Sequence, residues 1–231
     1  MAEKLGAARI ATLAVAAALG VLTLYFGVPR TVAAFVLLPG DRPLQALQNG
    51  RVPPAQALAN IVGTRTAGAH WIEQGQLYSD RALVRLVEAE QAAKGESPSK
   101  DKLEAVAGDL VRGLSLAPVN PHAWARLSYV RYLEKDLPGV ASTLRMSFLT
   151  GPYEPEITFP RLRLALAAYS NFLTEERELT KRQIRFAWLL SRDEVVELAL
   201  LSQRILVFRL ALVNQPQDLA IFDAMLKERA S

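Results

Sequence analysis

The chain has 231 residues, of which 51% are hydrophobic and 22% are charged, and its length accommodates a membrane anchor plus one domain with its own core. Residues 1–39 carry three basic and one acidic side chain, so +2 of the +4 net charge lies there and the other 192 residues are nearly balanced. This balance gives no sign of a dense basic face for nucleic acid, and the absence of cysteine excludes disulfides and thiolate metal sites.

After a short tail, residues 1–9, the segment Ile10–Val28 is an uncharged run of 19 residues. As a helix it spans about 28 Å, close to the roughly 30 Å thickness of a hydrocarbon layer. A cleaved signal peptide would have a shorter apolar core and small residues at its cleavage site, and a buried soluble helix would show a polar face. The run therefore predicts an uncleaved transmembrane signal-anchor over residues 10–28.

The charges that flank this anchor give a modest orientation signal. Lys4, Arg9 and the N-terminal amine favour a cytoplasmic N-terminus, whereas Arg30 and Arg42 on the far side weaken the bias. We expect one span, with the bulk of the chain outside the cytoplasm.

Residues 29–52 form a juxtamembrane segment in this prediction. Within it, Thr31–Leu38 is too short for a second span, and Pro43–Gln48 predicts a short helix closed by Asn49-Gly50. The next helices are predicted over residues 54–70, 80–94 and 102–116.

The chain after Gly151 favours helix strongly, because it contains no further glycine and little proline. Ser191 and Glu194 have capping-box spacing, which marks a helix start. No segment alternates with period two, so the predicted fold is all-α, with residues 53–231 as one helical domain. Helices are predicted here over residues 156–173, 175–190, 192–213 and 217–229.

One segment has the spacing of a helical repeat. Pro118 and Pro152 lie 34 residues apart, the period of the tetratricopeptide repeat, with Asp136–Gly139 as the turn between two helices. Such a hairpin buries its open face only by stacking on neighbours. The repeat is degenerate, since Arg131 replaces the expected tyrosine, and an unrelated helical bundle is the alternative. The residues predicted to pack the repeat are Pro118, Trp124, Leu127, Leu144, Ser147 and Pro152.

The anchor together with residues 115–163, above all APVNPHAWARLSYVRYL and SFLTGPYEPE, resembles small membrane-anchored bacterial proteins associated with exopolysaccharide or capsule production. Those proteins have an N-terminal span and a short helical-repeat domain, and they are regarded as accessory factors rather than enzymes. The resemblance implies a place in an envelope pathway, in a bacterial inner membrane, with the bulk of the chain in the periplasm.

Side chains suited to catalysis are sparse. His70 and Glu73 share a predicted helix face, but two ligands do not make a metal site, and His122 has no partner at helical spacing. No phosphate-binding loop or serine-nucleophile motif occurs, so we predict no catalytic, cofactor-binding or metal-binding residue. Acidic pairs such as Glu175 and Glu176 are assigned to polar faces or first turns.

A basic group follows these acids along the same predicted helix. It is assigned to a solvated face, with a surface for acidic lipid or anionic polysaccharide as the alternative. Its members are Lys181, Arg182 and Arg185.

Three functions are compared. The first is a membrane-anchored scaffold or assembly factor for a protein partner, the second is a glycan-binding subunit of a polysaccharide complex, and the third, an enzyme, lacks a candidate site. A groove with exposed apolar and aromatic side chains would favour a protein partner. Open aromatic rings beside polar groups would favour sugar, and the candidates are Trp71, Tyr78 and Tyr153.

Overall fold

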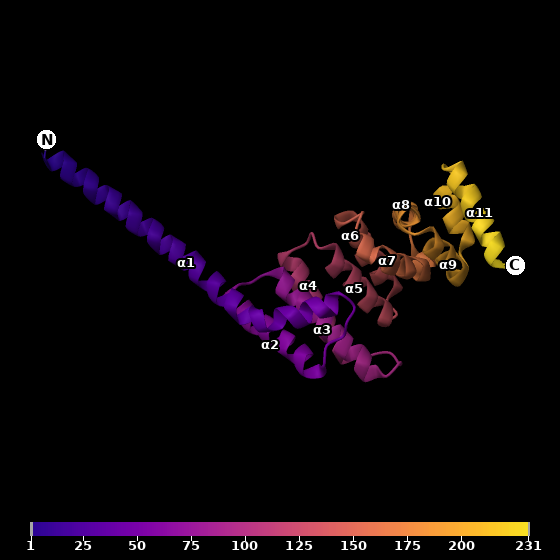
Figure 1. Ribbon diagram of the computed structural model, residues 1–231, viewed down its shortest axis with the longest axis horizontal. Helices are drawn as coiled ribbons and strands as arrows, with labels where there is room; N and C mark the ends of the chain where they lie inside the picture. The colour runs from indigo at the N-terminus through magenta and orange to yellow at the C-terminus, as the bar shows by residue number, and fades with distance from the viewer. Residues whose placement is uncertain (1, 231) are drawn as a thin grey trace. The chain divides into compact units, whose positions relative to one another are not determined.

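The computed structural model describes residues 2–230, with side chains from residue 12 to residue 229 (Figure 1). Every regular element in the described range is a helix, which confirms the predicted all-α class. Contacts divide the chain into two compact units, Met1–Val84 and Arg85–Ser231. The boundary falls inside helix α3 (Gly75–Ala93), whereas the sequence suggested one domain over residues 53–231.

The first unit begins with α1 (Ala2–Gln48), a continuous helix of 47 residues. At 1.5 Å per residue it is about 70 Å long. Among the described residues it is the one helix that is long and apolar enough to cross a membrane. The helix contains the predicted span but continues through Pro29, so the separate short helix predicted over Pro43–Gln48 is wrong: it is the last part of α1.

Three prolines lie inside α1, at positions 29, 39 and 43. A proline has no backbone N–H, so each one leaves the carbonyl four residues earlier without its helical donor. For Pro43 that carbonyl belongs to Pro39, and Asn60 Nδ2 of the next helix donates to it over 3.4 Å. The neighbouring helix thus supplies a donor that α1 lacks at this point.

Helix α2 (Ala55–Trp71) runs back alongside the second half of α1 (Figure 1). Two glycines bring the helices close together. A Cβ on Gly40 would overlap Thr64 Oγ1, and one on Gly68 would lie 2.7 Å from Leu37 Cδ2. A larger residue at either glycine would therefore push α1 and α2 apart.

A buried guanidinium ties α1, α2 and α3 together within this unit. Arg65 donates from Nη2 to Asp41 Oδ1 at 2.8 Å, from Nη1 to Leu37 O at 3.2 Å, and from Nε to Asp80 Oδ2 at 3.3 Å. Gln76 Nε2 donates to Asp80 Oδ1 at 2.7 Å. Asp80 is buried, whereas half of the Asp41 side chain is exposed. Each nitrogen of the Arg65 guanidinium has an acceptor, which offsets the cost of burying its charge.

The second unit consists of helical hairpins that stack in two rows, preceded by α4 (Lys100–Leu116), which packs on the first hairpin. Each helix contacts its hairpin partner and the next helix of its own row (Figure 1). The first row is α5 (Pro121–Leu133), α7 (Pro155–Ala168), α9 (Arg192–Ser202) and α11 (Pro216–Ala230). The second row is α6 (Leu137–Thr150), α8 (Thr174–Leu190) and α10 (Ile205–Leu212).

Polar caps set the starts of three of these helices. Asn120 Oδ1 accepts from Ala123 N at 3.0 Å, and an Asp136 oxygen accepts from Gly139 N at 3.0 Å. Ser191 Oγ accepts from Glu194 N at 3.3 Å, which confirms the helix start predicted from the capping-box pattern. The caps satisfy backbone donors that a helix cannot satisfy internally.

Two predicted helix ends are corrected. The helix predicted over residues 192–213 is two helices, because Gln203 adopts a left-handed conformation with φ 56° and ends α9. The reversal turns Val207 and Phe208 of α10 into the core. The helix predicted over residues 156–173 ends at Ala168 and is followed by the 3-10 turn Tyr169–Asn171.

The C-terminal core is built around Trp188, Phe208 and Phe222, all of them buried. The Trp188 and Phe222 rings meet edge to face with centroids 5.9 Å apart, and Trp188 Nε1 donates to Asp218 Oδ1 at 2.8 Å. The last helix, α11, thereby closes the end of the stack.

We predict that Arg65→Met opens the first unit. The variant removes the Arg65 charge from the buried Asp80 carboxylate, a loss of about 3–5 kcal/mol for a broken buried pair. Hydrogen exchange on the full chain in detergent should show α2 amides losing protection by two or more orders of magnitude. Asp41→Asn is the matched control and should have a much smaller effect, because that carboxylate is half exposed. Unchanged protection in Arg65→Met would contradict the assignment.

Candidate functional site

A groove of about 440 Å³ lies between α5 and α7, the first helices of two consecutive hairpins. Its lining residues follow helical spacing on both helices, so each helix contributes one face. We call it the α5–α7 groove. It is lined by His122, Ala125, Arg126, Tyr129, Tyr132, Ile157, Pro160, Arg161, Arg163, Leu164 and Ala167.

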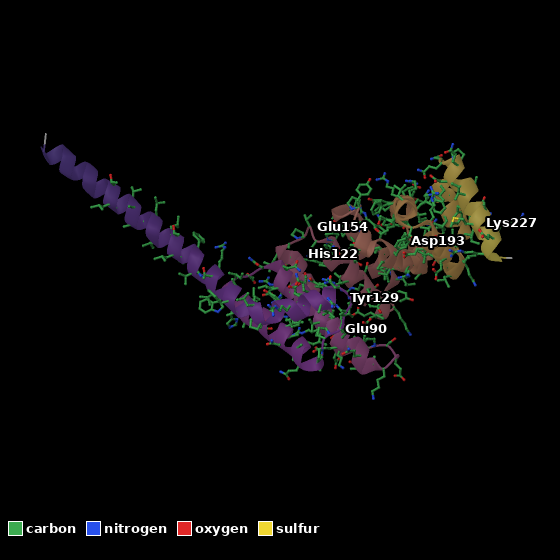
Figure 2. All side chains as sticks on the ribbon, viewed as in Figure 1. Glu90, His122, Tyr129, Glu154, Asp193 and Lys227 are labelled. Carbon is green, nitrogen blue, oxygen red and sulfur yellow. The ribbon has the colours of Figure 1, made fainter. Side chains whose placement is uncertain are left out.

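The lining of the α5–α7 groove is apolar and positively charged, and it contains no carboxylate. Burial and the nearby Arg126 lower the pKa of His122, against the opposing influence of Glu154. Glu154 Oε2 lies 4.0 Å from His122 Nε2, at one end of the groove (Figure 2). His122 is therefore neutral at pH 7, and the arginines Arg126 and Arg163 supply the charge.

Tyr129 forms part of the wall of the groove, and a hydrogen bond to a residue of α3 holds its side chain in place. Its hydroxyl donates to Glu90 Oε1, on the part of α3 that belongs to the second unit, over 2.7 Å (Figure 2). Burial and this hydrogen bond raise the pKa of Tyr129 to about 12. The hydroxyl thus stays protonated throughout the neutral range, and the ring is held in place.

Arg161 on α7 is fully buried and joins three helices. Its Nη1 donates to Ser147 O at 3.0 Å and to Gly151 O at 2.7 Å, at the C-terminal end of α6. Its Nη2 donates to Gln183 Oε1 on α8 at 2.8 Å, and its Cζ lies 5.3 Å from the centroid of the Phe148 ring. Burial lowers the pKa of Arg161 to about 10, so it remains charged at neutral pH beside the negative end of the α6 dipole.

A second hollow, of about 340 Å³, lies between α7 and α9. Arg163 lines both hollows, and Arg204 adds another cation to the second one. Leu198 and Leu201 give it an apolar wall, and its lining again has no carboxylate. The two hollows therefore follow one another along the first row with the same chemical character.

The second row carries a different surface, a hollow of about 570 Å³ between α6 and α8. Tyr153 is 74% exposed there, and its ring lies edge-on to Phe186 with centroids 5.3 Å apart. Arg182 is exposed beside it, whereas Arg185 donates to Ala211 O of α10 at 3.0 Å. Of the predicted basic group, Lys181 pairs with Glu178, so only part of that group faces solvent freely.

Three of the predicted repeat-packing residues are buried in the α5–α6 hairpin. Leu127 and Leu144 are core residues, and Ser147 Oγ donates to Pro121 O at 2.8 Å. A Cβ on Gly151 would lie 2.5 Å from Pro121 Cγ, so the end of α6 sits directly against the start of α5. The small residues allow this close approach.

The other three predicted residues lie at the edges of the hairpin. Trp124 is half-buried, and its Nε1 donates to Pro118 O at 2.8 Å. Pro152 is exposed just after α6. None of the six predicted residues lines the α5–α7 groove.

One of the two expectations about charged residues is wrong. His70 and Glu73 do not share a helix face, because α2 ends at Trp71 and Ile72 is extended with φ −139°. Glu175 and Glu176 lie in the first turn of α8, as expected, and Glu176 is buried there. Among the described residues, no three His, Cys, Asp or Glu side chains converge closely enough to hold a metal ion.

Comparisons with protein-family models, with curated proteins and with solved structures find no match to this chain.

The α5–α7 groove was not predicted from the sequence, although the pattern of buried residues on α7 is visible there. Thr158, Arg161, Leu162 and Ala165 recur at the i, i+3, i+4, i+7 spacing of a buried stripe, and all four are buried. Arg161 is thus placed in an apolar face, where an arginine must find acceptors. Arg163, two residues later, lies outside the stripe and is exposed.

We predict that Tyr129→Phe lowers the free energy of unfolding of the second unit by about 1.5 kcal/mol, the lower end of the range for hydrogen bonds to charged groups, because this bond is exposed. Because the pKa of Tyr129 is raised to about 12, its stabilising contribution is complete below pH 10 and is lost between pH 10 and pH 12. The difference between wild type and variant should hence be constant from pH 6 to pH 9 in denaturant titrations. Tyr132→Phe is the control, and a loss of equal size there would contradict the role of Glu90.

Proposed function

We propose that this chain is a non-catalytic, membrane-anchored scaffold or assembly factor whose second unit binds an extended acidic segment of a protein partner. The single observation that carries the proposal is the α5–α7 groove, which combines apolar walls with arginines and has no carboxylate in its lining. Apolar walls bury aliphatic side chains, and guanidinium groups bind carboxylates in a bidentate manner.

The spacing of the helices suits an extended chain. Neighbouring helix axes lie about 8–10 Å apart, so the two hollows from α5 to α9, with Arg163 and Arg204 in their lining, extend over about 20 Å. An extended segment covers that distance with about six residues at 3.3 Å each. A segment that alternates acidic and aliphatic residues would place carboxylates on the arginines and apolar groups against Ile157 and Leu164.

The wider assignment rests on the sequence and on the stacking of the hairpins. Stacked hairpins with a 34-residue proline spacing are what tetratricopeptide-like packing would produce. The resemblance to accessory proteins of bacterial exopolysaccharide production supports an envelope pathway, with α1 in the inner membrane and the rest of the chain in the periplasm. In that setting the chain would hold a partner beside the membrane without catalysing a reaction.

A glycan-binding subunit is the second candidate, because of the hollow between α6 and α8. Tyr153 offers an open ring there, supported by Phe186 and flanked by Arg182 and Gln215. The α5–α7 groove fits sugar less well, since no Asp, Glu, Asn or Gln lines it to accept hydrogen bonds from sugar hydroxyls. Of the other rings considered for sugar, Tyr78 is covered by Arg81, whose Cζ lies 5.1 Å from the ring centroid.

We expect the full-length protein in detergent to bind a fluorescent six-residue peptide of alternating glutamate and leucine, as measured by anisotropy. Arg163→Glu should weaken binding at least tenfold, which corresponds to about 1.4 kcal/mol, because it replaces a favourable charge pair by repulsion. Arg182→Glu makes the same charge change on the second row and should leave the affinity unchanged.

The glutamine–leucine peptide is the control ligand and should bind more weakly than the acidic one. Equal affinity for the two peptides, or equal effects of the two variants, would remove the acidic segment from the proposal. Binding of oligouronate that Tyr153→Ala abolishes would favour the glycan candidate instead.

The membrane anchor gives a separate prediction. The full chain should stay in the membrane pellet after alkaline carbonate extraction, and a variant lacking residues 2–30 should be released, because it has lost the uncharged run. The cut is placed at residue 30 because Ala33, Leu37 and Gly40 belong to the packing against α2. Release of the full chain would contradict the transmembrane assignment.

A further inference from the structure

Two large aromatic side chains of the first unit are exposed without an evident reason. Trp71, the last residue of α2, is 49% exposed, and Phe35 on α1 is 69% exposed. In this stretch Ala33 of α1 is buried and Leu37 lies against Gly68 of α2, whereas Leu38 of α1 is 59% exposed, like the two rings. A soluble stalk would gain nothing from exposing a tryptophan and a phenylalanine together.

The register of the two helices places these side chains at the same height. Helix α2 is antiparallel to α1, with Thr64 beside Gly40 and Gly68 beside Leu37. Continuing this register by three residues beyond Gly68 sets Trp71 level with residues 33–34 of α1. Figure 1 shows the end of α2 lying against α1 on the side toward the N-terminus of that helix.

That height can be measured from the end of the uncharged run. Residues 33–34 lie five or six positions beyond Val28, or about 8–9 Å at 1.5 Å per residue along the helix. Each headgroup layer extends about 5–8 Å beyond the hydrocarbon, so Trp71 falls at its outer edge. Arg30 lies between these two levels, where a cation meets lipid phosphate.

We infer that α2 returns to the membrane surface and that Trp71, together with Phe35, contacts the lipid headgroup layer. The inference rests on the proposed anchoring of α1 in the bilayer. Tryptophan is enriched at this depth because its ring is amphipathic. The α1–α2 pair would then touch the bilayer at a second point besides the span, which restricts the tilt of the pair.

The chain has no cysteine, so single spin labels can be introduced without background. The full chain is reconstituted in phosphatidylcholine vesicles with some phosphatidylglycerol, and each variant carries one label. His70→Cys reports the depth at the proposed contact, Leu19→Cys the depth inside the span, and Gln45→Cys a position well outside it. The measurement is the ratio of relaxation by oxygen to relaxation by a water-soluble nickel complex. We expect the ratio at His70→Cys to be severalfold above that at Gln45→Cys and below that at Leu19→Cys.

Substitution of Trp71 tests whether its side chain contacts the headgroup layer or only lies near it. Adding Trp71→Ala should move the His70→Cys ratio to the value of Gln45→Cys, and Trp71→Tyr should keep it. A His70→Cys label that matches Gln45→Cys while Leu19→Cys remains lipid-exposed would overturn the inference and leave the anchor intact. A label shielded from both reagents would also overturn it, because a protein surface would then cover the site. Water-like values at Leu19→Cys would remove the anchor itself.

Discussion

The second unit depends on a guanidinium that is entirely removed from water. Arg161 lies in the buried stripe of α7, where it donates hydrogen bonds both to carbonyls at the C-terminal end of α6 and to Gln183 of α8. Gln183 in turn donates to Pro152 O at 2.6 Å, which fixes the turn between two hairpins. Since the cation joins α6, α7 and α8, it fixes their relative positions, and Arg161 also forms part of the α7 wall of the α5–α7 groove.

The first unit also contains a buried arginine that joins several helices, but its hydrogen-bond partners differ. Arg65 meets two carboxylates and a backbone carbonyl of α1, whereas Arg161 meets backbone and amide oxygens. Arg161 meets carbonyls at the C-terminal end of α6, which that helix cannot satisfy itself, whereas Arg65 is neutralised by its carboxylates. Both cations are therefore structural, and the cations available to a ligand are those outside the buried stripes, such as Arg163.

How much of this the sequence discloses depends on whether a signal is local. The apolar run and the cap at Ser191 are signals in consecutive residues and were predictable. The turn predicted over Asp136–Gly139 is misplaced, because α6 begins at Leu137 and Asp136 is its cap. The break at Gln203 has neither glycine nor proline to announce it, because it results from packing α10 against α8. The groove is made by two helices that are separated by a third, so no short motif describes it. Arg161 and Arg163 are two residues apart, yet Arg161 is buried and Arg163 is exposed. Only their positions around the axis of α7 distinguish them.

Because α1 is one continuous helix, the number of residues in it sets the rotation of α2 about the helix axis relative to the uncharged run. A helix advances 100° and 1.5 Å with each residue. Because no flexible joint separates the uncharged run from the Gly40 contact, adding one residue between Val28 and Ala33 would turn α2 a quarter of the way around the stalk. In the proposed membrane anchor, the number of residues between Val28 and Gly40 thus sets which face of the span α2 lies above.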